Sequence, residues 1–226
     1  MQFKKLYFLF LRFGFIVTIQ FIVHFYILQT QINQRFSKQL NHEVLSAVSQ
    51  PSVSATSVKS AEKYYIDLSF WLFENLLRAF NLNLHREKSM RILDLGCGPG
   101  YFIYIANYFG HHAEGLDLDS NELYNFMMQH LKIKRHAQAI NAFQKLSMPL
   151  SKKYDLVTAF MICFDKHGTD ASWGVEEWVF FITDIQNNLL ASKSRLILGL
   201  NPESNLEKRS SVNLLLKEFL YLADEG

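Results

Sequence analysis

Hydrophobic positions divide the chain into two parts. Residues 6–28 form one long apolar stretch, whereas short apolar runs alternate with segments of helical periodicity from about residue 61 onward. The short runs predict strands over 90–95, 112–117, 136–140, 154–160 and 195–200, and the segments between them predict helices over 101–109, 120–131, 174–191 and 205–222. Strands separated by helices pair in parallel through right-handed crossovers, so the sequence predicts an α/β domain.

The apolar stretch at 6–28 is long enough to cross a bilayer core of about 30 Å at about 1.5 Å per residue. Arg12, Gln20 and His24 interrupt it and fall on one narrow stripe of a helix. A membrane span, an in-plane amphipathic anchor and a helix buried against a partner all fit this pattern. The span is favoured because the mean apolarity is high for an in-plane helix.

Two further segments separate this stretch from the α/β region. Apolar residues at every fourth position over 31–48 predict a second helix, and the Ser-rich segment 46–60 predicts a linker. The expected organisation is a membrane-anchor helix over 1–30, a helix and linker over 31–60, and a folded domain over 61–226.

Charge and cysteine content narrow the classes of function. A net charge of +2 gives no strongly basic surface, so no nucleic-acid partner is expected. The two cysteines, Cys97 and Cys163, provide no disulfide framework, and neither has His or Cys spacing for a metal site.

The segment 93–100, Leu-Asp-Leu-Gly-Cys-Gly-Pro-Gly, lies between a predicted buried strand and a predicted helix. Its glycines leave the turn without side chains, so backbone amides can approach a nucleotide-like ligand closely. The spacing is G-x-G-x-G, and bulky Tyr101 follows, whereas a dinucleotide-binding turn has G-x-G-x-x-G. With Asp94 two residues before Gly96, the segment resembles motif I of the class I S-adenosylmethionine-dependent methyltransferases.

This resemblance covers residues 61 to 202 and implies a Rossmann-like, doubly wound, mostly parallel sheet with strand order 3-2-1-4-5. It also implies S-adenosylmethionine as the cofactor. The residues expected to hold the cofactor at the first turn are Asp94, Gly96, Cys97, Gly98 and Gly100. The family ends in a further antiparallel strand pair, for which residues beyond 205 offer no candidate.

Three more segments match the family in order. Asp117 follows Asp94 by 23 positions (117 − 94), close to the offset of about 20 at which an acid meets a ribose, and Leu118 is expected at the adenine edge. Asp119 is the rival acid, although it could instead cap the next helix. Asn141 and Ala142 stand where the family commonly has Asp-Ala, and an amide oxygen can still accept from adenine.

The fourth predicted strand ends at Phe160, which is expected to border the methionine end of the cofactor. In the loop that follows, His167 is the candidate base for an oxygen acceptor, and Asp165 could orient it or act as the base. Trp173 and Trp178 either shape an acceptor pocket or simply pack. Asn201-Pro202 lacks the Asn-Pro-Pro-Tyr signature of amino-group methylation, which favours an oxygen or carbon acceptor.

The favoured hypothesis is a membrane-tethered methyltransferase that acts on a small-molecule or lipid-linked acceptor. Its domain should face the cytoplasm, where S-adenosylmethionine is found, although flanking lysines and arginines fix no orientation. A catalytically inactive relative that serves as a binding or assembly module at a membrane is the alternative. Tyr101 and the glycine spacing disfavour a nicotinamide-dependent oxidoreductase, and oligomerisation is left open.

Overall fold

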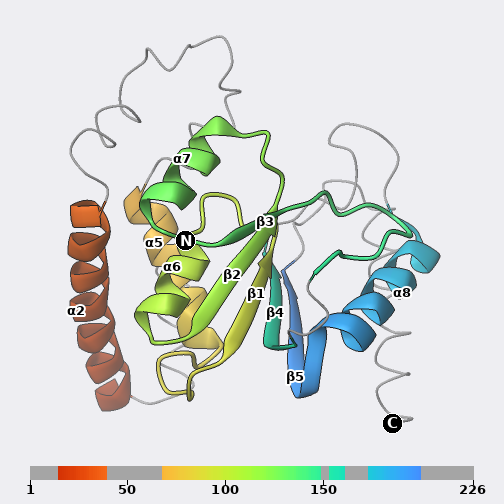
Figure 1. The fold of residues 1–226 in the computed structure, drawn as a ribbon. Coiled ribbons are helices and arrows are strands. Elements are labelled where there is room, and N and C mark those ends of the chain that lie inside the picture. Colours follow the sequence, from red (N-terminus) through yellow and green to blue (C-terminus); the bar gives the residue numbers. More distant parts are fainter. Residues whose placement is uncertain (1–14, 40–67, 149–152, 161–172, 200–226) are drawn as a thin grey trace. The chain divides into compact units, whose positions relative to one another are not determined.

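The computed structural model describes residues 15–39, 68–148, 153–160 and 173–199 (Figure 1). The chain divides into two compact units, residues 1–83 and 84–226. Each unit is described by itself below. The domain boundary predicted near residue 61 lies outside the described residues and stays a prediction.

The first unit contains helices α2 (Phe15–Gln39) and α5 (Leu68–Asn81), which pack against each other. Phe25, Ile32 and Phe36 are buried along one face of α2, because they recur at helical spacing. The ring of Phe25 lies edge-on to those of Phe73 and Phe80, with centroids 5.4 and 5.3 Å apart. Aromatic packing therefore joins the two helices.

The predicted break between two N-terminal helices is wrong. A single helix, α2, runs through residues 30 and 31, where the sequence predicted a break between two helices. Within the described ranges, no helix has both the length and the apolar character needed to cross a membrane. Residues 1–14, which hold the first part of the predicted span, lie outside the described residues.

The second unit is built on a five-stranded sheet of β1 (Arg91–Leu95), β2 (His112–Asp117), β3 (Arg135–Ala137), β4 (Tyr154–Phe160) and β5 (Leu190–Gly199). The strand order is β3-β2-β1-β4-β5 and all four pairings are parallel, which confirms the predicted topology (Figure 1). The order reverses between β1 and β4. In open α/β sheets, this reversal places the ligand crevice at the carboxyl ends of the central strands.

Element boundaries differ from the predictions mainly at β3 and β5. β3 is only three residues long and β5 begins at Leu190, five residues before the predicted start. Helix α8 (Val175–Asp184) continues into a π-helical turn, Ile185–Leu189. The α-helix is therefore shorter than the helix predicted over 174–191. The early start of β5 is accompanied by a register shift against β4 and by a left-handed Lys193 with φ 61°. The predicted helix at 205–222 lies outside the described residues.

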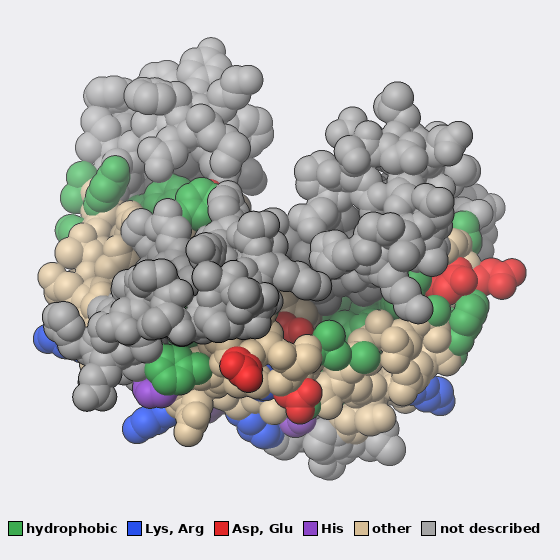
Figure 2. All heavy atoms as spheres, turned by 90° about the horizontal axis from the view of Figure 1, so that it is seen from above, with side chains coloured by type: hydrophobic (Ala, Val, Ile, Leu, Met, Phe, Trp, Pro, Cys, Tyr) green, Lys and Arg blue, Asp and Glu red, His purple; other side chains and the backbone are tan. Residues whose placement is uncertain are grey.

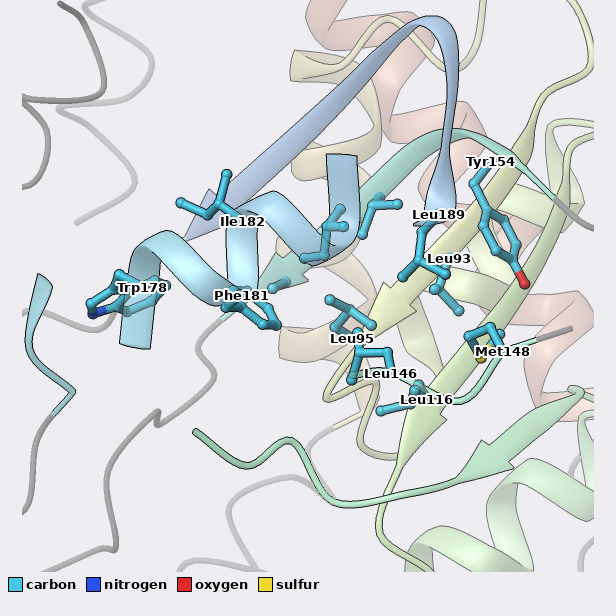
Figure 3. Packing of buried hydrophobic residues seen from close by; sticks show 13 residues of the cluster. Leu93, Leu95, Leu116, Leu146, Met148, Tyr154, Trp178, Phe181, Ile182 and Leu189 are labelled. Atoms are coloured by element: carbon cyan, nitrogen blue, oxygen red, sulfur yellow. The ribbon is translucent and has the colours of Figure 1, made fainter. Parts of the chain in front are cut away.

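Helices cover both faces of this sheet. On one face, α8 and the turn after it pack onto a buried cluster, which Figure 3 shows from close by. The strands contribute Leu93, Leu95, Leu116, Tyr154, Val157 and Ala159, and the helical segment contributes Trp178, Phe181, Ile182, Ile185 and Leu189. Trp178 is thus a core residue, 7% exposed, and its ring lies 5.4 Å from that of Trp173, so packing is the role that the structure gives to these tryptophans.

The other face is covered by α6 (Tyr101–Tyr108) and α7 (Glu122–His130). The first six residues of α6 are all buried, because the helix packs against β2. Asn121 caps α7, since its Oδ1 accepts from the amide of Tyr124 at 3.1 Å. The alternative that Asp119 caps this helix is therefore wrong, because the capping residue lies two residues later and the helix begins at Glu122.

Candidate functional site

The glycine turn between β1 and α6 is attached to the end of β2. Gly96, Gly98 and Gly100 have φ values of 64°, 52° and 83°, a backbone conformation that residues other than glycine rarely adopt. The amide of Gly96 donates to the carbonyl of Leu116 at 2.7 Å, and the amide of Gly98 donates to Oδ2 of Asp117 at 2.6 Å. The turn is therefore held in one conformation by the neighbouring strand.

Asp117 closes this arrangement at the carboxyl end of β2. Its Oδ2 accepts from Gly98 and its Oδ1 accepts from the amide of Leu118 at 2.7 Å. Burial raises the pKa of Asp117, and the two amide hydrogen bonds and the positive charge of Arg135 oppose that rise. Because each carboxylate oxygen can accept more than one hydrogen bond, Asp117 keeps acceptor capacity for a further pair of hydroxyls.

Gly115, in the middle of β2, is a site residue that sequence reasoning missed. A Cβ on Gly115 would lie 2.4 Å from Sγ of Cys97 and 2.8 Å from Cδ1 of Ile103. Only the absence of a side chain there lets the turn and α6 settle onto the sheet. A glycine inside a predicted strand was the available signal, since it often marks a close backbone approach.

The three turn glycines have different surroundings. A Cβ on Gly100 would lie 2.6 Å from Sδ of Met128 and 2.7 Å from Cδ1 of Ile133, so Gly100 is packed against the α7 region. A Cβ on Gly98 would come no closer than 3.8 Å to the described side chains, where Cε2 of Tyr124 is its nearest neighbour. The structure therefore gives Gly100 a packing role, and its direct contact with a cofactor stays a prediction.

Asp94 lies beneath the turn, where the strand order reverses. It is 4% exposed, and its Oδ1 accepts from Oγ1 of Thr158 at 2.7 Å across the β1–β4 pairing. Cys97 is also buried, and burial together with the carboxylates of Asp94 and Asp117 raises the pKa of its thiol. A buried thiol of this kind is an inert packing group and no nucleophile.

The remaining predicted cofactor residues follow or end strands β2, β3 and β4. Leu118 is 50% exposed directly after Asp117, as an apolar contact for a ligand would be. Asn141 and Ala142 are exposed in the loop after β3, where Nδ2 of Asn141 donates to Oε1 of Gln144 at 2.7 Å. Phe160 ends β4 with its ring 5.0 Å from that of Phe102. In the middle of the view in Figure 2, described hydrophobic and acidic side chains are exposed next to one another.

The structure thus brings Asp94, the glycine turn and Asp117 together and places Leu118 beside them. The predicted catalytic residues, His167 and Asp165, lie outside the described residues, and their roles stay predictions.

One family model matches part of the chain. Residues 68–163 match the model of a family described as a methyltransferase domain. The parallel sheet with order β3-β2-β1-β4-β5 is the Rossmann-like arrangement predicted from the resemblance to class I methyltransferases. No curated protein matches the sequence.

Several solved structures are similar to this chain. The PH0226 protein from Pyrococcus horikoshii OT3 is 15% identical with a TM-score of 0.44, and the match covers 67% of this chain and 63% of that one. A TehB-like SAM-dependent methyltransferase from Corynebacterium glutamicum is 17% identical, with coverage of 62% and 70% and a TM-score of 0.45. CalS10, an amino pentose methyltransferase from Micromonospora echinaspora, is 22% identical, with coverage of 61% and 52% and a TM-score of 0.42.

Proposed function

We propose that this chain binds S-adenosylmethionine and transfers its methyl group to a small-molecule or lipid-linked acceptor, on oxygen or carbon. The observation that carries the proposal is the joint between the glycine turn and Asp117. A turn without side chains is fixed beside a carboxylate that retains acceptor capacity. The match of residues 68–163 to a methyltransferase domain supports the same reading.

The residues present fit this cofactor. Asp117 would accept from the two ribose hydroxyls, the open backbone at Gly98 would lie against the amino-acid part, and exposed Leu118 would contact the adenine. When bound, the cofactor supplies an electrophilic methyl group on a sulfonium. The chain's own contribution is to orient that group, since positioning supplies a large part of the acceleration in displacement reactions.

Calorimetry on the full chain tests the cofactor assignment. S-adenosylhomocysteine should bind and NAD should not. Asp117→Ala should weaken the binding by about 1–3 kcal/mol, or roughly 5- to 150-fold, because it removes hydrogen bonds to a charged acceptor. Asp119→Ala is the matched control, since Asp119 is exposed and the contact found for it uses its backbone carbonyl. Equal affinities of the two variants would refute the ribose assignment.

Methyl transfer is tested separately from binding. Full chain incubated with labelled S-adenosylmethionine and cell extract should label an acceptor. Binding without any labelled product would favour the alternative of a catalytically inactive binding or assembly module. Attachment to a membrane through residues 1–30, with the domain in the cytoplasm, stays a prediction.

A further inference from the structure

Arg135 of β3 lies on the same face of the sheet as the cofactor site. It is the register partner of Gly115, two residues before Asp117 in β2. Side chains of paired residues point to the same face, and residues two apart in a strand do so as well. The guanidinium of Arg135 therefore shares its face with Gly115 and Asp117. The hypothesis from sequence gave this residue no role.

The surroundings of Arg135 connect it to the segment that follows Asp117. Its Nη2 donates to Oδ1 of Asn125 in α7, and Nδ2 of Asn125 donates to the carbonyl of Asp119 at 2.7 Å. Its Nη1 is buried and finds no hydrogen-bond acceptor among the described residues. A buried N–H without an acceptor costs about 1–3 kcal/mol.

The guanidinium of Arg135 lies close enough to several acidic groups to act on them electrostatically. Asp94 of β1 and Asp117 of β2 both act on the thiol of Cys97, and Arg135 opposes them there. The charge of Arg135 also lowers the pKa of Asp117 against the effect of burial. Tyr124 of α7 and Asp119, in the loop between β2 and α7, are further titratable groups near the glycine turn and Asn125. Arg135 is thus a cation set among acidic groups.

We propose that Arg135 is a positioning residue of the cofactor site. Its positive charge compensates the carboxylate of Asp117, and through Asn125 it fixes the backbone at Asp119, so that an anionic, oriented acceptor faces the ribose hydroxyls. This inference rests on the proposed function. Neither the glycine turn nor Asp117 supplies this positive charge.

The test is the affinity for S-adenosylhomocysteine between pH 5 and pH 8, measured by calorimetry on the full chain. Removing the charge with Arg135→Gln should raise the pKa of Asp117, so binding should be lost at a higher pH than in the wild type. We expect affinity within about twofold of wild type at pH 8 and at least roughly threefold weaker at pH 5. Arg135→Lys keeps the charge, so its affinity for S-adenosylhomocysteine should fall toward pH 5 in the same way as that of the wild type.

Two further variants separate charge from structure. Asn125→Ala keeps the charge of Arg135 and should weaken binding by a similar factor at every pH. Lys134→Gln removes an equal charge one residue away, where Lys134 pairs with Glu114 on the opposite face, and should leave the profile unchanged.

The outcomes are distinct. A wild-type chain that does not bind S-adenosylhomocysteine at pH 8 refutes the proposed function itself. If the wild type binds and the affinity of Arg135→Gln changes with pH in the same way as that of the wild type, the role of Arg135 is refuted and the proposed function is not. Should Arg135→Gln fail to fold, Arg135→Lys decides. A loss of affinity at higher pH than in the wild type would contradict a role for the charge, because this variant keeps it.

Discussion

Replacing Gly115 by alanine should disturb the cofactor site from beneath. The added Cβ would lie 2.4 Å from Sγ and 2.9 Å from Cβ of Cys97, whereas carbon atoms in contact are separated by about 3.5–4.0 Å. Rotating the thiol would not relieve the contact with Cβ. The strand cannot retreat easily, because β2 is paired with β1 and β3 on its two sides. The turn must therefore move away from the sheet.

The magnitude follows from two opposing effects. Overpacking a tight site costs about 1–3 kcal/mol, whereas replacing a strand glycine by alanine gains about 0.5–1 kcal/mol of backbone entropy. The net destabilisation of Gly115→Ala should be about 1–2 kcal/mol. Displacing the turn also strains the bonds of Gly96 and Gly98 to the end of β2, so affinity for S-adenosylhomocysteine should fall about tenfold.

Urea unfolding and calorimetry measure the two effects, and Cys97→Ala serves as the partner in a double-mutant cycle. That change removes Sγ and hence the shortest contact, so the two substitutions should be coupled by about 0.5–1 kcal/mol. Gly110→Ala is the control. Its Cβ would meet no heavy atom of the described chain within 4 Å, although its φ of 89° is strained, so stability should fall without a change in affinity. Additive effects of Gly115→Ala and Cys97→Ala would refute the packing argument.

Two other substitutions test buried polar groups away from the cofactor. Burial works to raise the pKa of Glu114, but hydrogen bonds from Lys134, Tyr154 and His136 outweigh it and lower the pKa from 4.5 to about 2. Glu114 therefore contributes stability above about pH 4.5 that is lost as the pH falls toward about 2. In Glu114→Gln, the urea midpoint should fall less over that pH range than in the wild type. An equal fall of the urea midpoint in both proteins would contradict this. His111 accepts from the amide of Met90 at 3.1 Å and bonds the carbonyl of Leu84 at 2.9 Å, so His111→Phe should cost about 2–4 kcal/mol in urea unfolding. His112→Phe, at an exposed neighbour, should change stability by less than about 0.5 kcal/mol, and similar losses for both variants would contradict the role of these bonds.

Local patterns in the sequence were sufficient for the individual strands and the glycine turn. The strand order and the meeting of the turn with Asp117 followed from the resemblance to class I methyltransferases. The apolar runs predicted all five strands, and the glycine spacing predicted the turn between β1 and α6. These features depend on residues close together in the chain or on regular strand pairing. Hydrophobic periodicity reports both of them well.

Features set by distant neighbours escaped prediction. The need for glycine at position 115 comes from Cys97 and Ile103, which contact it across the sheet. The position of Arg135 beside Asp117 depends on the register of β3, which is only three residues long. The start of α7 was ambiguous because Asp119 and Asn121 are both good caps, and only the three-dimensional path of the loop selects Asn121.

The bonds between the glycine turn and the end of β2 also bear on how a ligand would bind. The amides of Gly96 and Gly98 are fixed by Leu116 and Asp117, that is, by bonds within the domain itself. The conformational entropy of the turn is therefore lost when the domain folds and not when the ligand arrives. A loop ordered in advance retains more of its contact energy as affinity. The same glycines that give the free chain its greatest backbone freedom thus make the folded site rigid before it is used.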